Sequence, residues 1–417
     1  MHRNPTAQLA LVILKKIPRV SIELLLNALV RPAIALLPRN PRLWVFGSSL
    51  SDFEGNAKYL FLWMRQNHPE ISCVWIARSR QAAAWLRGFG YDAEFRYSLR
   101  GMWMAIRGGA AFVTSYSSDI NTWATGGAKL INLWHGVSLK RIGYDSKKGV
   151  RSTILKNANN PLMRLAYLHR FILPDLFLST SEDMTRRYVS GFQLPADRII
   201  ETGHPRQQGS VDRLLRDEAG RTGRSASIDQ IIDQGRRVLV YMPTWRDSDR
   251  PFIGQALPDL RRLDAALERV GSTLFVSFHS NSSENFDVST LANVRLWPKN
   301  ADFYYYKDEI DGIITDYSSS LYDYVARRDS GVVLYDFDRD EYLSKDRELI
   351  FPYEENVVGR RASTFDELCT AIESGSAFSR LDAERLAMIR RRFWGESRDD
   401  GCEQIFHRVL GLLRLER

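Results

Sequence analysis

The feature that most constrains this chain is a series of short, nearly uninterrupted apolar runs, each followed by a stretch long enough for a helix. Such runs predict strands buried on both faces, as in parallel sheets that helices cover on either side. The runs form two groups, which lie before and after residues 207–237. They are residues 43–47, 73–77, 111–114, 130–134, 176–180 and 199–202 in the first group, and 238–242, 274–278, 294–297, 312–315 and 332–335 in the second.

The chain is long enough for two such sheets. Its 417 residues exceed the roughly 250–300 at which a single hydrophobic core stops growing. We expect an N-terminal domain over residues 41–206, a polar linker over 207–237, and a C-terminal domain over 238–417 that includes closing helices. Ligands bind beyond the carboxyl ends of parallel strands, so two facing domains form a cleft. The predicted fold class is α/β of the GT-B type, with two Rossmann-like domains.

Residues 1–40 differ from the rest of the chain. Residues 1–42 carry seven basic side chains and one acidic one, a net charge of +6, among runs of Leu, Ile, Val and Ala. Charges and prolines keep these runs below the roughly 18–20 residues that a spanning helix needs, and no cleavage-like site follows them. We expect amphipathic helices on an anionic membrane, which places the protein peripherally on its cytoplasmic face. The alternative is that they pack against the protein itself.

A second basic region covers residues 137–170, which carry eight basic side chains and one acidic one, a net charge of +7. Since the whole chain carries +8, all residues outside these two regions sum to −5. Two separate basic regions indicate two anionic partners, or one large anionic surface that is met at two places.

A histidine directly follows one of the expected strands. The run at residues 130–134 leads into His135 and Gly136, and Lys140 and Arg141 follow closely. Because glycine permits backbone angles that turn the chain sharply, we expect His135 to project into the cleft. Its imidazole titrates near neutral pH and could take a proton from a hydroxyl group while the two cations hold anionic groups nearby. A structural role is the simpler interpretation of any single histidine.

The second domain repeats this design, because its run at residues 274–278 leads into His279. Two histidines at the carboxyl ends of strands in facing domains would meet across one cleft. A loop histidine held by its polar neighbours is the alternative for His279 alone.

Polar side chains suited to phosphate follow two other strands of the second domain. Ser318, Ser319 and Ser320 precede an expected helix, and the free N–H groups at a helix start attract phosphate. Thr244 and Arg246 follow another strand, where Arg246 could hold a phosphoryl group with two hydrogen bonds. A capping serine and a surface arginine are the simpler interpretations.

Several classes of chemistry lack their motifs in this chain. There is no Walker lysine motif, no GxGxxG after a strand, and no His/Asp cluster with metal spacing, which argues against nucleotide hydrolysis, dinucleotide redox chemistry and zinc catalysis. Cys73, Cys369 and Cys402 are too far apart for a CxxC site and odd in number, which favours a reducing compartment. We expect no metal, no cofactor and no nucleic acid partner.

An ordered set of motifs spans about residues 42–359. It comprises Glu54-Gly55-Asn56-Ala57-Lys58, Trp134-His135-Gly136 with Lys140 and Gly143, Gly203-His204-Pro205-Arg206, residues 241–246, and residues 315–319 followed by Tyr322-Asp323-Tyr324. As a set it resembles the motifs of the CDP-glycerol glycerophosphotransferase family, which contains teichoic-acid primases and polymerases and related capsule polymerases. The chain departs from that pattern at Gln207-Gln208, at Ser280 after the second histidine, and at Val358.

The resemblance implies a peripheral membrane enzyme with a GT-B fold. It would transfer glycerol phosphate or ribitol phosphate from a CDP-polyol donor to a lipid-linked or polymeric anionic acceptor and release CMP, with the CDP-polyol as substrate and no separate cofactor. His135 and His279 match the two catalytic histidines of the family. The expected donor-binding residues are Thr244, Arg246, Ser318, Ser319 and Ser320, and the expected acceptor-binding residues are Lys140, Arg141 and Asn56.

Two other functions stay open from the sequence. A GT-B glycosyltransferase would use a sugar nucleotide, release a nucleoside diphosphate, and form a product without a phosphodiester. A non-catalytic protein that binds anionic polymer at a membrane would keep its function without His135.

Overall fold

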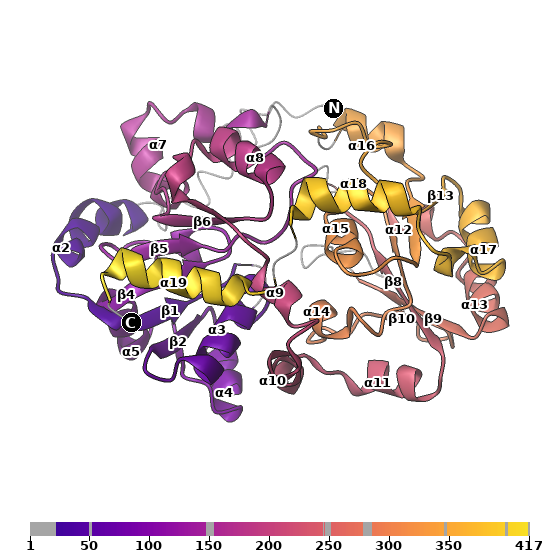
Figure 1. Ribbon diagram of the computed structural model, residues 1–417, viewed down its shortest axis with the longest axis horizontal. Helices are drawn as coiled ribbons and strands as arrows, with labels where there is room; N and C mark the ends of the chain where they lie inside the picture. Colours follow the sequence, from indigo (N-terminus) through magenta and orange to yellow (C-terminus); the bar gives the residue numbers. More distant parts are fainter. Residues whose placement is uncertain are drawn as a thin grey trace.

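Two parallel sheets form two domains that lie side by side (Figure 1). The computed structural model describes residues 22–49, 52–146, 154–244, 246, 252–277, 286–345, 348–396 and 399–415. The first sheet has the strand order β3-β2-β1-β4-β5-β6-β7, and the second has the order β10-β9-β8-β11-β12-β13. All pairings in both sheets are parallel. This confirms the predicted fold class.

Every apolar run identified in the sequence overlaps a strand. The first sheet consists of β1 (Asn40–Phe46), β2 (Ser72–Ala77), β3 (Ala93–Phe95), β4 (Gly108–Val113), β5 (Lys129–Asn132), β6 (Leu176–Ser179) and β7 (Ile199–Glu201). The second consists of β8 (Arg237–Met242), β9 (Ser272–Val276), β10 (Val294–Leu296), β11 (Gly312–Thr315), β12 (Val332–Tyr335) and β13 (Arg360–Ala362). The three-residue edge strands β3 and β13 were not expected.

Helices cover both faces of each sheet, which explains why central strands such as β4 and β11 are buried at every position. Those of the first domain are α2 (Arg31–Ala35), α3 (Gly55–Asn67), α4 (Arg80–Gly88), α5 (Leu99–Arg107), α7 (Pro161–Ala166) and α8 (Glu182–Phe192), with η1 (Leu26–Val30) before α2. Those of the second are α12 (Ile253–Ala256), α13 (Leu260–Arg269), α14 (Phe303–Tyr306), α15 (Ser320–Val325), α16 (Arg339–Lys345), α17 (Phe365–Glu373) and α18 (Ala383–Trp394). Many begin at a side-chain cap, as α4 does at Ser79.

The segment between the sheets is helical and packed, although we expected a linker at residues 207–237. It holds the second half of α9 (Pro205–Gln208) and the whole of α10 (Arg213–Gly223) and α11 (Ala226–Asp233). Helix α10 lies against α3 of one domain and α14 of the other, and α11 lies against β8. The segment therefore belongs to the interface between the domains.

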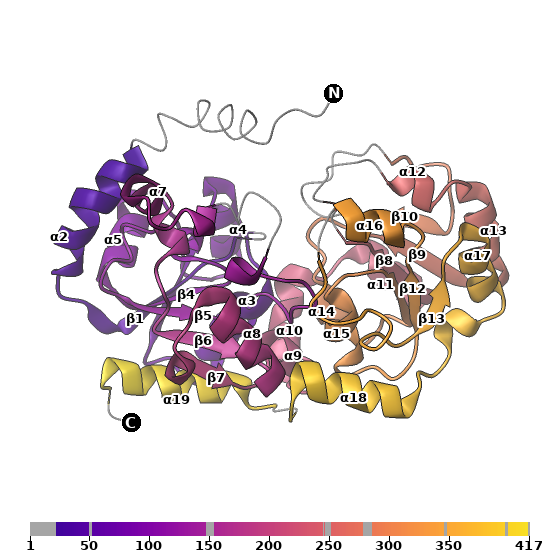
Figure 2. The same cartoon turned by 90° about the horizontal axis from the view of Figure 1, so that it is seen from above.

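The chain returns to the first domain at its end. Figure 2 shows α18 and α19 (Gly401–Leu413) end to end along one side of the molecule, with α19 against the first domain. Cys402, Ile405 and Val409 are buried in the core of that domain. The C-terminal domain, which we expected to cover residues 238–417, therefore ends near Trp394. The expected boundary was wrong because apolar periodicity shows that a helix has a buried face but not which core that face packs against.

Two buried ion pairs cross between the domains. Lys58 Nζ lies 2.6 Å from Asp302 Oδ2, with side chains only 1% and 7% exposed. Arg206 of α9 pairs with Asp323 of α15, with side chains 2% and 4% exposed. Since each charge was desolvated on folding, each needs its partner in the other domain.

Candidate active site

His135 lies in a tight turn that follows β5. The turn contains Trp134 at φ +50° and Gly136 at φ +156°. A left-handed conformation at a residue other than glycine costs on the order of 1–3 kcal/mol. The surrounding structure must hold such a turn in place.

Three buried side chains hold the four consecutive carbonyl groups of residues 133–136. Asn56 Nδ2 donates to the first two, at 2.9 and 3.0 Å. Arg206 Nη1 donates to the third, the carbonyl of His135, at 2.9 Å, and Tyr188 Oη donates to the fourth at 3.1 Å. These bonds fix the direction in which the imidazole leaves the strand.

The imidazole of His135 is oriented by the end of the neighbouring strand β4. Its Nδ1 lies 3.0 Å from the carbonyl oxygen of Thr114 and 3.4 Å from Oγ of Ser115. A carbonyl oxygen can only accept, so Nδ1 carries the proton and donates it. In the neutral ring, Nε2 then has the lone pair that a general base needs.

The turn faces Ser319 of the second domain. A Cβ atom added to Gly136 would lie 3.5 Å from Nη2 of Arg206 and 3.6 Å from Oγ of Ser319. Ser319 immediately precedes α15, which also carries Asp323. The structure therefore brings together His135 and the serine turn, which the sequence placed in separate domains.

Arg206 and Asp323 are the charged centre of this junction. Nη2 of Arg206 lies 2.7 and 2.8 Å from the two carboxylate oxygens, and Tyr304 Oη donates to the same carboxylate at 3.0 Å. The ring of Tyr304 lies 4.5 Å from the guanidinium carbon. Although burial acts to lower it, the Asp323 carboxylate raises the pKa of Arg206 above its usual value. Arg206 and Asp323 were part of the family motifs but were not expected to be site residues.

Asn56 has a different place from the one expected. It was an expected acceptor-binding residue, but it has no exposed surface. Its amide donates to the turn, and its Oδ1 accepts from the backbone N–H of Arg206 at 3.4 Å. The structure gives Asn56 the role of holding the turn under His135.

Lys140 and Arg141 lie where the first domain meets the second. The backbone of residues 139–141 pairs with that of residues 348–350. Lys140 Nζ lies 5.4 Å from the ring centre of Tyr342, and Arg141 Nε lies 3.6 Å from a carboxylate oxygen of Glu348. Both cations thus lie beside the junction, on the domain that carries His135.

Arg246 does not have the arrangement that we expected for a phosphate contact. Its side chain is 1% exposed and bonds two carboxylates, Asp338 through Nε and Nη2 and Asp316 through Nη2, each at 2.9 Å. Its Nη1 donates to the carbonyl of Thr244 at 2.6 Å. Burying a guanidinium requires such partners, and they use the donors that a phosphate would have needed.

The other expected donor-binding residues remain near the carboxyl ends of β8 and β11. Ser318, Ser319 and Ser320 are half-buried, and Ser320 Oγ donates to Ser318 Oγ at 2.8 Å. Thr244 donates its backbone N–H to Asp316 at 2.9 Å, while its buried Oγ1 has no hydrogen-bond partner among the described residues. His279 lies outside the described residues.

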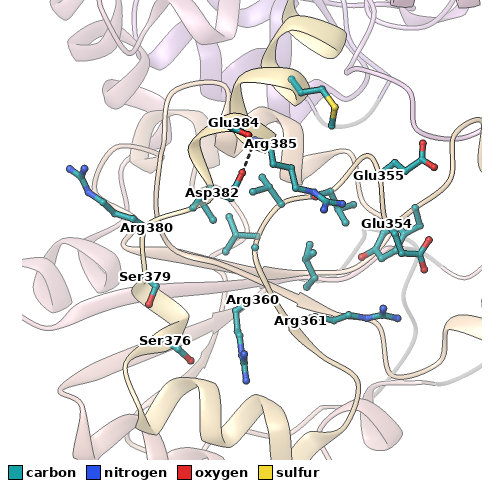
Figure 3. A pocket seen from close by; sticks show the side chains of 18 of the residues that line it. Glu354, Glu355, Arg360, Arg361, Ser376, Ser379, Arg380, Asp382, Glu384 and Arg385 are labelled. Carbon is teal, nitrogen blue, oxygen red and sulfur yellow. Dashed lines mark hydrogen bonds between the residues drawn. The ribbon is translucent and has the colours of Figure 1, made fainter.

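A cavity of about 1110 Å³ lies elsewhere, at the β12–β13 edge of the second domain (Figure 3). Its rim carries Arg361 and Arg385 as well as Glu354 and Asp382. Charges of both signs line it, and it shares no residue with the junction at His135. Chemistry at the strand ends, and not cavity size, identifies the candidate active site.

Comparison with known proteins identifies a family and several relatives of this chain. A family model described as CDP-Glycerol:Poly(glycerophosphate) glycerophosphotransferase matches residues 30–411. The teichoic acid poly(glycerol phosphate) polymerase of Bacillus subtilis is 25% identical over 334 residues, which are 77% of this chain and 42% of that protein. A protein of the same description from Bacillus spizizenii is 22% identical over 94% of this chain and 98% of its own length. The chain spans about two fifths of the B. subtilis relative.

Solved structures share the fold. The wall teichoic acid polymerase TagF has a TM-score of 0.71 at 20% identity, with 99% of each chain covered. A UDP complex of MnaA from S. aureus has a TM-score of 0.51 at 10% identity, with 89% of this chain and 97% of that chain covered. These matches support the two-domain arrangement independently of the strand pattern.

Proposed function

The chain belongs to the CDP-glycerol:poly(glycerophosphate) glycerophosphotransferase family, and we propose that it transfers a polyol phosphate in teichoic acid synthesis. The donor is a CDP-linked glycerol or ribitol, and the acceptor is a lipid-linked or polymeric anionic chain that ends in a hydroxyl group. The products are a phosphodiester and CMP. The observation that carries this proposal is the turn of His135, which faces Ser319 of the second domain.

The residues of the first domain act on the acceptor. Nε2 of His135 takes the proton of the acceptor hydroxyl, whose oxygen attacks the phosphorus that bears the polyol. The bond between that phosphorus and the oxygen bridging to CMP breaks, and CMP leaves with this oxygen. Lys140 and Arg141 lie on the same side of the junction and attract the anionic acceptor.

The residues of the second domain hold the donor. The hydroxyls of Ser318, Ser319 and Ser320 and the Oγ1 of Thr244 supply donors for the pyrophosphate, and His279 assists the departing CMP. Arg246 keeps Asp316 and Thr244 in place instead of contacting phosphate. Phosphoryl transfer depends mostly on positioning and charge stabilisation, so these residues support the reaction without a cofactor beyond the CDP-polyol itself.

Product analysis tests this function. The protein is incubated with a panel of CDP-polyols and a synthetic lipid acceptor, and the products are identified by mass spectrometry. We expect phosphodiester-linked products and CMP, and at least roughly a hundredfold lower turnover for His135→Ala, the usual contribution of a general base. His407→Ala, at a partly exposed histidine of α19, is the matched control. Near wild-type turnover in His135→Ala, or release of a nucleoside diphosphate, would reject the proposal.

Peripheral binding at the cytoplasmic face of an anionic membrane is part of the same proposal. Along residues 22–36, the exposed face is apolar and includes Ile22, Leu25, Leu29 and Leu36, which are between 58% and 87% exposed. A helix that packed only on its own protein would turn these residues inward. No helix within the described ranges is long and apolar enough to cross a membrane.

A further inference from the structure

We propose that Asp119 is a positioning residue that orients and activates His135 through a single peptide group. The inference rests on the proposed role of His135 as the base. Asp119 has no contact with the acceptor in this arrangement, because it acts from beneath the turn that follows β4.

The contacts form a continuous chain from the carboxylate to the imidazole. Oδ2 of Asp119 accepts from the backbone N–H of Ser115 at 2.8 Å, from that of Thr114 at 2.9 Å, and from Oγ1 of Thr114 at 3.2 Å. The N–H of Ser115 and the carbonyl of Thr114 belong to one peptide group. That carbonyl accepts the proton of His135 Nδ1 at 3.0 Å.

A carboxylate on the N–H end of a peptide polarises the group and makes its carbonyl oxygen more negative, because hydrogen bonds in a chain strengthen one another. The more negative oxygen favours the proton on Nδ1 of His135. It also stabilises the imidazolium that forms when Nε2 takes the acceptor proton. No proton passes through the peptide, so Asp119 keeps its own state during the reaction.

The burial of Asp119 makes this effect large enough to matter. The residue is 2% exposed, so water does not screen its charge. Burial raises the pKa of Asp119 to about 6, although the bonds from Ser115 and Thr114 act to lower it. The carboxyl is therefore mostly charged at pH 7 and above.

Other charged or titratable groups lie near His135 and Asp119 among the residues that the structure describes. Arg206 bonds its carbonyl, and Asp323 neutralises that cation. His204 is buried, and burial followed by the nearby Arg206 holds its pKa well below the usual value, so it is neutral. On the side of Asp119, Arg96 donates to the carbonyl of Ser118 at 2.9 Å. None of these groups is changed in the variants of the following test.

The test compares the pH dependence of turnover in Asp119→Asn and wild type. Asparagine keeps the size and an acceptor oxygen but removes the charge. We expect kcat to fall on the order of 10-fold, as is common when the outer partner of a functional side chain is lost. The acid limb of the pH–rate profile moves to lower pH, because the imidazolium loses stabilisation, while KM for the CDP-polyol stays unchanged. Asp119→Glu, which restores the charge, recovers part of kcat.

The matched control is Asp175→Asn. Asp175 also accepts a backbone N–H, that of Leu130 at 2.9 Å, but at the opposite end of β5 from His135. The inference is wrong if Asp119→Asn lowers kcat without moving the acid limb of the pH–rate profile. It is also wrong if kcat falls no more in Asp119→Asn than in Asp175→Asn. In either case Asp119 only shapes the turn. If Asp119→Asn does not fold, Thr114→Val removes the 3.2 Å side-chain bond and must move the acid limb in the same direction. If His135→Ala loses turnover but the acid limb of Asp119→Asn does not move, only this inference is rejected. If His135→Ala stays active, the proposed function is rejected.

Discussion

Arg206 donates to both oxygens of Asp323 across the domain interface, at 2.7 and 2.8 Å, and at the same time to the carbonyl of His135 at 2.9 Å. A single guanidinium thus ties the turn of His135 to the helix that follows the serine turn. The contact between the two domains and the orientation of the proposed base therefore depend on the same side chain.

Asp323→Asn should destabilise the protein, because Arg206 would remain buried without its counter-ion. We expect a loss of about 3–5 kcal/mol, seen as a lower midpoint of thermal unfolding by calorimetry. Asp329→Asn is the control, since its pair with Arg380 is exposed and 4.0 Å long and such pairs contribute little. Equal midpoints for the two variants would show that the Arg206 pair does not hold the domains together.

Changing Ser318 and Ser319 together to Ala should weaken binding of the CDP-polyol without affecting the fold. The loss of hydrogen bonds to a charged phosphate corresponds to about 1–3 kcal/mol, measured by calorimetric titration with CDP-glycerol and CDP-ribitol. Ser376→Ala, at a serine beside the other cavity, should change nothing. Unaltered donor affinity in the double variant would place the pyrophosphate away from this turn.

Arg246→Ala should lower the stability of the fold, whereas the double serine variant should weaken donor binding. It leaves Asp316 and Asp338 buried without a cation, and losing one partner of a buried pair costs about 3–5 kcal/mol. Arg186→Ala is the control, because Arg186 pairs with Glu182 at 3.2 Å and both side chains are exposed, at 63% and 77%. An Arg246→Ala protein that melts like wild type yet fails to bind CDP-polyol would restore the direct phosphate contact expected from the sequence.

Leu25→Glu with Leu29→Glu should reduce binding to anionic vesicles strongly, because the charges oppose insertion of the exposed apolar face. Salt should weaken wild-type binding only in part, since inserted apolar surface is not screened. Leu214→Glu is the control, as Leu214 is 73% exposed on a different helix. Co-sedimentation of the double variant at the wild-type level would assign the N-terminal helix to packing alone.

The stability of the protein should depend on pH through the titration of Asp119. Its pKa is raised by burial from 3.8 to about 6, so the folded state holds the proton more tightly than the unfolded state. The stabilisation from this proton is complete below about pH 4 and is lost as pH rises to about 6, a change of about 3 kcal/mol. Thermal midpoints of wild type relative to Asp119→Asn should therefore fall across this window. A constant difference would mean that Asp119 does not titrate there.

The fold class could be predicted from the sequence because buried parallel strands are recognisable from local runs of apolar residues. A strand buried on both faces must be apolar at nearly every position, and eleven of the strands could be located on that basis. The edge strands β3 and β13 were missed, because Ala93–Phe95 and Arg360–Ala362 are three residues long and include charged residues. The equally short edge strands β7 and β10 were located, so a run of this length is a weak signal. The sequence also did not show which domain α19 packs against, because both domains have apolar cores.

The sequence by itself determined that a histidine and a glycine follow a buried strand, and the ordered motifs around them indicated the family. Only the tertiary structure decided what each polar residue does. Arg246 is part of a buried ion cluster. Asn56 and Arg206 hold the turn of His135, and Asp119 bonds the peptide group that the imidazole contacts. Arg206 lies 71 positions from His135 and 117 from Asp323 along the chain. A charged side chain can contact a ligand, water or a counter-ion. Which of these it contacts depends on the distant residues that exclude water from it, and a local sequence pattern cannot predict those residues.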